Sequence, residues 1–232
     1  MTTANDAQQL RELQGKLWDI ADSLRGKMHA DEFRDYCLGF IFYKYLSEQF
    51  ANYADHILKQ DGLTYSSLDI HSPDYADILE AVKSDAIEAI GYYLPPESLF
   101  HSLAKRVQAD PKGVGQGFIL EDLSKILRGI EQSTLGSESV DDFSNLFEDL
   151  DLTSSKLGNT EAAKNELIAS IINKLDELSF NLTDANTDIL GDAYEYLIGE
   201  FASGAGKKPV NSIRPNPFLP CWLKLSQLIN SN

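Results

Sequence analysis

Residues 31–59 constrain the fold more than any other stretch, because apolar side chains occur there on almost every side of a predicted helix. Six of them follow the three-and-four spacing of one helical face: Phe33, Cys37, Phe40, Ile41, Tyr45 and Leu46. Leu38 and Phe42 lie off that stripe. Since a helix that is apolar on most sides must be covered on most sides, we expect this helix in the middle of a bundle.

Amphipathic periodicity predicts helices along most of the remaining chain. Helices are expected over 6–25, 119–133, 161–178 and 189–201, with Thr160 as the N-cap of the third. A further helix is expected to begin at an N-cap at Ser72 and to end at Gly91, and another to begin at Glu97. A short helix is expected after Asp141. The sequence shows neither a convincing alternating strand nor an internal repeat. The predicted fold class is therefore all-α, an irregular bundle of seven or eight helices with little or no β-structure.

Cysteine usage and apolar segment lengths point to a cytoplasmic protein without a membrane anchor. The two cysteines, Cys37 and Cys221, are too far apart to suggest a disulfide framework or a metal site. The N-terminus lacks the pattern of a signal peptide. The apolar run 36–46 is too short to cross a bilayer and contains Lys44. We expect this lysine to reach solvent at the bundle rim, with a partner contact as the alternative.

The charge of the chain is strongly acidic and unevenly distributed. The formal net charge is −16, which argues against a free-standing DNA-binding protein. Residues 51–200 carry 28 acidic and 10 basic side chains, whereas residues 201–232 carry four basic and no acidic ones. Four of the eight prolines also follow Lys208, so the last 24 residues differ in composition from everything before them.

None of the short motifs satisfies the requirements of a catalytic or cofactor site. The glycines of 113–117 follow no predicted strand, which favours a surface loop over a nucleotide-binding turn. The 203–208 stretch lacks the first glycine and the final Ser or Thr of a phosphate-binding loop. The four histidines have no metal-ligand spacing, and paired acids mean little in so acidic a chain. We therefore predict no catalytic, cofactor-binding or metal-ligating residue.

Four segments in order resemble one known family. They read LWDIADSLRGKMHADEFRDYCLGFIFYKYLSEQF (17–50), GYYLPPESLF (91–100), DFSNLFEDLDLTSSKLGNT (142–160) and LGDAYEYLIGEFASGAGKK (190–208). Together they resemble the N-terminal helical domain of the modification (M) subunit of type I restriction–modification systems. The first and last segments are the most specific.

The resemblance implies a role in an adenine-specific DNA methyltransferase. In that family a Rossmann-like catalytic domain follows, which binds S-adenosylmethionine and acts on an adenine flipped out of the duplex. Two modification subunits flank one specificity subunit, and a motor–nuclease subunit can join them on double-stranded DNA. The helical domain helps to clamp the duplex and to assemble the complex. An acidic helical module that binds proteins and has no DNA role is the alternative.

The chain departs from the family after Lys208. Residues 209–213 stand where the family continues with Gly-Glu-Phe-Tyr-Thr-Pro, and residues 216–218 lack the second proline of the catalytic Asn-Pro-Pro motif. We expect a helical domain over 1–180, a helix and glycine-rich loop over 181–208, and an unrelated tail over 209–232 left by an interrupted reading frame. On this interpretation the chain is truncated, binds no S-adenosylmethionine and is inactive alone.

Contacts to DNA phosphates are expected at two small basic clusters. Lys207 and Lys208 lie on the predicted glycine-rich loop, and Arg25, Lys27 and Arg34 form the second cluster. Solvated side chains are the alternative at each position.

Overall fold

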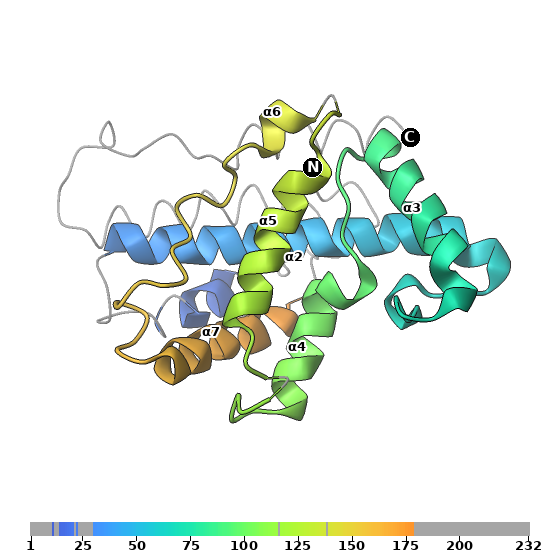
Figure 1. Cartoon of the computed structure of the whole chain (residues 1–232). Coiled ribbons are helices and arrows are strands. Elements are labelled where there is room, and N and C mark those ends of the chain that lie inside the picture. Colours follow the sequence, from blue (N-terminus) through green and yellow to red (C-terminus); the bar gives the residue numbers. More distant parts are fainter. Residues whose placement is uncertain are drawn as a thin grey trace.

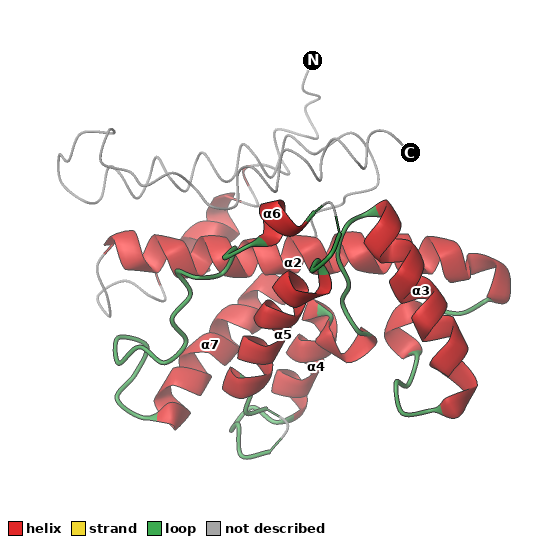
Figure 2. Cartoon of the chain, turned by 45° about the horizontal axis from the view of Figure 1, so that its top comes forward, coloured by secondary structure: helices red, strands yellow, loops and turns green. Residues whose placement is uncertain are grey.

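The computed structural model describes residues 11, 14–20, 22, 30–115, 117–137 and 139–178, with the side chains of 30–35 and 142 left out. This part of the chain contains α-helices, short 3-10 turns and loops, and no strand (Figure 2). The predicted all-α class is confirmed. The segments 181–208 and 209–232, with the helix expected over 189–201, lie outside the described residues.

Helix α2 (Ala30–Leu58) is the axis around which the other helices pack (Figure 1). All twelve residues from Tyr36 to Ser47 are buried, including the off-stripe Leu38 and Phe42. The prediction that this helix stands in the middle of the bundle is therefore confirmed. At Gly39 the segment that follows helix α6 (Val140–Phe143) comes closest, because a Cβ atom there would overlap Leu150 Cδ1.

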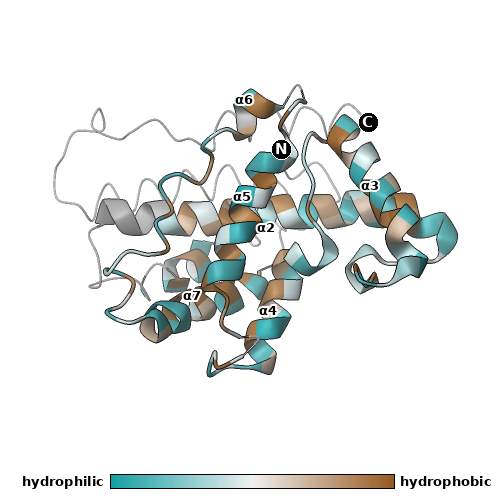
Figure 3. Cartoon of the chain, in the orientation of Figure 1, coloured by the Kyte–Doolittle hydropathy of each residue, from teal (hydrophilic) through white to brown (hydrophobic). Residues whose placement is uncertain are grey.

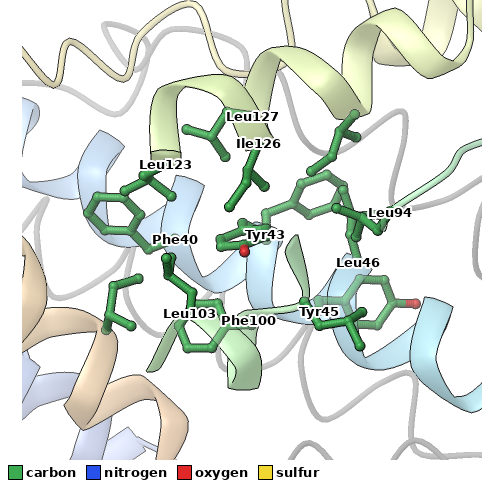
Figure 4. Close-up of a cluster of buried hydrophobic side chains, with 14 of the residues drawn as sticks. Phe40, Tyr43, Tyr45, Leu46, Leu94, Phe100, Leu103, Leu123, Ile126 and Leu127 are labelled. Atoms are coloured by element: carbon green, nitrogen blue, oxygen red, sulfur yellow. The ribbon is translucent and has the colours of Figure 1, made fainter. Parts of the chain in front are cut away.

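Helices α4 (Phe100–Ala109) and α7 (Glu161–Asp176) pack against each other and against α2, and α5 (Leu120–Ser133) contacts α7 (Figure 2). Figure 4 shows Tyr43 of α2 between Ile126 and Leu127 of α5 on one side and Phe100 of α4 on the other. The rings of Tyr43 and Phe100 have centroids 5.2 Å apart. Each of the three helices alternates hydrophilic and hydrophobic positions, as expected for helices that bury one face (Figure 3).

Residues 91–99, the strap, cross α2 in a largely extended course before α4 begins. Prolines 95 and 96 disfavour helix there, although a short 3-10 turn forms over Pro96–Ser98. Buried hydrogen bonds fix the strap and the start of α4: Tyr92 Oη to Leu46 O (2.7 Å), Tyr43 Oη to Ser98 O (2.7 Å), Tyr65 Oη to Leu94 O (2.8 Å) and Phe100 N to Ser47 Oγ (2.7 Å). These bonds satisfy the polar backbone atoms that the extended course exposes to the core.

Most predicted helix boundaries agree with the structure. Ser72 accepts a hydrogen bond from Asp74 N and caps the 3-10 turn Pro73–Tyr75, which leads into α3 (Ala76–Ala89). Thr160 Oγ1 accepts from Ala163 N and caps α7, as predicted. The short helix α6 spans Val140–Phe143. The helix expected from Glu97 instead begins at Phe100, because Glu97 lies in the 3-10 turn Pro96–Ser98 and Leu99, which follows that turn, is extended.

The thiol of Cys37 is completely enclosed in this core. Its exposed fraction is 1%, and burial raises its pKa to about 12. In a Cys221→Ser variant, we expect Cys37 to react with a thiol reagent about 1000-fold more slowly than a free thiol, until denaturant is added. Absorbance at neutral pH follows the reaction, and labelling of the native protein at the rate of a free thiol would contradict the buried position.

Candidate functional site

The residues predicted to contact DNA phosphates lie almost entirely beyond the described part of the structure. Lys207, Lys208, Arg25 and Lys27 are outside the described residues. Arg34 belongs to α2 by its backbone, but its side chain is also outside them. The structure therefore does not test these five positions, and they remain predictions.

The glycine-rich loop between α4 and α5 holds a carboxylate of its own chain. Asp110 Oδ2 accepts hydrogen bonds from Gly115 N at 2.6 Å and Gly117 N at 3.2 Å. These backbone N–H groups lower the pKa of Asp110 below its usual value, so the carboxylate stays ionised to a lower pH than a free one. Since Asp110 occupies the donors that a phosphate would need, the structure favours the surface-loop interpretation of 113–117.

Asn165 of α7 fastens the other side of this loop. Its Oδ1 accepts from Ile119 N at 2.7 Å, and its Nδ2 donates to Gly117 O at 2.9 Å. Asn165 is 3% exposed, so both bonds are shielded from water. The loop is thus fixed at both ends while Val114 at its tip remains 86% exposed.

We expect Asn165→Ala to lower the free energy of unfolding by about 2 kcal/mol or more, because it leaves two buried backbone groups without partners. Urea denaturation measures the decrease, and hydrogen exchange at the Ile119 amide should accelerate with it. Asn159→Ala is the matched control, since Asn159 is exposed. Equal stability of the two variants would contradict the anchoring role.

A basic face extends along α4 and α5. Arg106 Nη1 lies 2.8 Å from Asp122 Oδ2, so these two positions face each other across the antiparallel pair. With 3.6 residues per turn, Lys105 then projects to the same side as Lys125 and Arg128. All three are exposed. Lys112 is exposed on the loop that joins the helices, and we call these four residues the basic face.

Three members of the basic face have no carboxylate partner. Lys125 pairs with Glu121 at 2.7 Å. Lys105, Lys112 and Arg128 form no ion pair with any other described residue. The sequence motifs considered above do not single out these four positions. The sequence did contain a signal for a basic region in the charge distribution. Residues 101–128 carry five Lys and Arg and three Asp and Glu, whereas the remaining chain carries 15 Lys and Arg and 33 Asp and Glu.

Lys44 differs from the sequence-based expectation. The residue is 3% exposed, its amine pairs with Glu48, and it lies 5.2 Å from the centroid of the Phe100 ring. The expected solvated position at the bundle rim is therefore wrong, because α4 covers this side of α2. Its contacts to Glu48 and to an aromatic face stabilise a buried ammonium.

The other polar features of the described region provide no catalytic arrangement. His101 Nδ1 lies 3.1 Å from both carboxylate oxygens of Asp176 and links α4 to α7 at the surface. A hollow of about 560 Å³ lies between the loop 155–159 and α7, and Glu166 is the carboxylate in its lining. Within the described residues, no three His, Cys, Asp or Glu side chains gather as a metal site would require. No helix there could span a membrane.

Comparisons with known proteins agree with the helical architecture. The family model described as "HsdM N-terminal domain" matches residues 13–175. The methylase subunit of the type I restriction enzyme MpnII of Mycoplasma pneumoniae is 31% identical over 207 residues, 86% of this chain and 36% of that protein. The MjaIX methylase subunit of Methanocaldococcus jannaschii is 24% identical over 196 residues, 84% of this chain and 32% of that protein.

A solved structure shares the fold. The crystal structure of the type I restriction–modification methyltransferase subunit from Streptococcus thermophilus is 34% identical, with a TM-score of 0.65, and the match covers 84% of this chain and 39% of that one. The chain thus spans about a third of the length of its curated relatives. The family match covers nearly all of the described helices, and the chain belongs to the family of N-terminal domains of type I restriction–modification methylase subunits.

Proposed function

We propose that this chain acts as a clamp and assembly module of a type I DNA methyltransferase, without carrying out the chemistry itself. The observation that carries the proposal is the match of the family to residues 13–175, combined with a chain that spans about a third of its relatives' length. In the complete enzyme, S-adenosylmethionine would supply the methyl group for adenine in double-stranded DNA. The remaining two thirds of the relatives' length would hold the cofactor and the flipped base.

The proposed partners are a specificity subunit, a second modification subunit and a motor–nuclease subunit. The rigid packing around α2 supports an assembly role, because a continuous core presents the outer faces of α3, α4, α5 and α7 in fixed positions. Contacts from Lys207, Lys208, Arg25, Lys27 and Arg34 to DNA phosphates are part of the proposal. The proposal also includes a cytoplasmic location and a segment over 209–232 that is unrelated to the family.

A second candidate function is an acidic protein-interaction module with no DNA role. The acidity of the described region favours it: residues 129–155 contain seven Asp or Glu and no Lys or Arg. Such a surface suits the basic side of a partner protein and repels phosphates.

Two measurements on the purified chain distinguish these functions. Binding of labelled duplex DNA that weakens steeply as salt is added supports the clamp, because bound phosphates release counterions. Co-elution with a type I specificity subunit, without DNA binding at any salt, supports the module that binds only proteins. Transfer of a labelled methyl group from S-adenosylmethionine to duplex DNA by this chain alone would contradict the proposal.

A further inference from the structure

We propose that the basic face of α4 and α5, formed by Lys105, Lys112, Lys125 and Arg128, contacts the sugar–phosphate backbone of duplex DNA. The inference rests on the proposed function, which places the chain beside a duplex, and it goes beyond it by assigning the contact to this surface. The charge, the direction and the rigidity of the face support this assignment.

The positive charge of this face is not cancelled by its own segment. Among residues 101–128, Asp122 is paired with Arg106 at 2.8 Å and Glu121 with Lys125 at 2.7 Å. The third carboxylate, Asp110, accepts from the N–H groups of Gly115 and Gly117. Every carboxylate of the segment is therefore occupied, while three cations of the face are left for an external anion.

Helical geometry also places the cations on one side of α4 and α5. Lys125 and Arg128 are three residues apart on α5, so they follow each other by about one turn along the exposed side. Lys105 projects to that side from α4, and Lys112 extends the row onto the loop. A row of amines and a guanidinium along adjacent helices suits a chain of phosphates, which repeats negative charge at short intervals.

The backbone of the face is held rigidly, so that only the cationic side chains have to be ordered when an anion binds. The Arg106–Asp122 pair joins α4 to α5, and Asn165 fixes the loop to α7. His101 joins α4 to α7 through Asp176. A preorganised cationic surface loses less entropy on binding than flexible side chains on a mobile loop.

Charge decides between nucleic acid and protein as the partner. The exposed apolar residues on the loop of this face are Val114 (86%) and Phe118 (37%), and two such residues provide less apolar surface than the centre of a typical protein interface. Residues 129–155, which follow this face in the chain, contain seven Asp or Glu and no Lys or Arg, so phosphates are attracted to the basic face and repelled by the segment after it. The contact is expected to be independent of base sequence, because phosphates carry no sequence information.

The test compares two triple variants of the full chain that remove the same charge. The site variant carries Lys105→Gln, Lys112→Gln and Arg128→Gln; the control carries Lys59→Gln, Lys83→Gln and Lys156→Gln. Binding of a labelled duplex is measured by fluorescence anisotropy between about 50 and 200 mM salt. Circular dichroism verifies that both variants melt at the temperature of the unaltered chain.

We expect the slope of log affinity against log salt to become shallower by about 0.9 for each phosphate that the site variant no longer neutralises. The control should keep the slope of the unaltered chain. Equal slopes in all three proteins would overturn the inference and leave the clamp function standing. Absence of DNA binding in all three would overturn both. Weakened capture of a specificity subunit by the site variant, with an unchanged salt slope, would assign the face to a protein partner and overturn the inference.

Discussion

Replacement of Phe50 by alanine is expected to lower the free energy of unfolding by about 3–5 kcal/mol, a large part of the stability of a typical domain. Phe50 is 0% exposed, and its ring packs against those of Tyr65, Tyr92 and Tyr93 at centroid distances of 5.3, 5.9 and 5.7 Å. Two of these tyrosines donate hydrogen bonds to α2 or the strap. The cavity left by the ring would therefore loosen the strap as well as the aromatic cluster.

Urea denaturation followed by circular dichroism measures this effect. Leu135→Ala is the control, because Leu135 is 70% exposed and its truncation should change stability by no more than about 0.5 kcal/mol. A decrease of less than about 1 kcal/mol for Phe50→Ala would contradict the packing of the aromatic cluster.

The second large effect is expected from a matched pair of glycine replacements. Both Gly39 and Gly129 lie inside helices, so alanine should favour helix formation at each by about 1 kcal/mol. A Cβ at Gly129 meets no atom within 4 Å, whereas a Cβ at Gly39 would lie 2.3 Å from Leu150 Cδ1 and 2.8 Å from its Cγ. We expect Gly129→Ala to stabilise the protein and Gly39→Ala to destabilise it by about 1–3 kcal/mol.

The difference between the two glycine variants isolates the contact with Leu150, because the gain in helix propensity is common to both. Thermal unfolding of the two proteins under one set of conditions provides the measurement. If Gly39→Ala is as stable as Gly129→Ala, the segment after α6 does not pack closely on α2. Leu150→Ala in the Gly39→Ala background should relieve the overlap and restore part of the stability.

A net charge of −16 is compatible with membership of a DNA-related family, because DNA binding depends on the charges close to the contact and not on the net charge. Net charge describes the distant field, which is repulsive toward DNA, whereas binding depends on charges within about a Debye length of the phosphates. The α4–α5 surface presents four exposed cations, together with the exposed carboxylate of Glu121 and that of Asp122, which is paired with Arg106. A weak isolated affinity that adds to contacts from other subunits is the expected behaviour.

The local features of this fold could be predicted because they depend on neighbouring residues. Helical periodicity located α2, α5 and α7, and the caps at Ser72 and Thr160 follow from side chains that reach their own first turn. The apolar composition of 31–59 also determined that α2 must be surrounded. The four segments that resemble the modification subunit were sufficient to identify the family.

The tertiary structure alone decided which distant residues meet. Lys44 is buried because α4 brings Phe100 over it, and the glycine loop is closed because Asp110 and Asn165 reach it from two helices. The basic face depends on the antiparallel course of α4 and α5, because the Arg106–Asp122 pair places Lys105 on the same side of the two helices as Arg128. Such alignments depend on how helices cross, which is set by the summed packing of the core, so no short stretch of sequence encodes them.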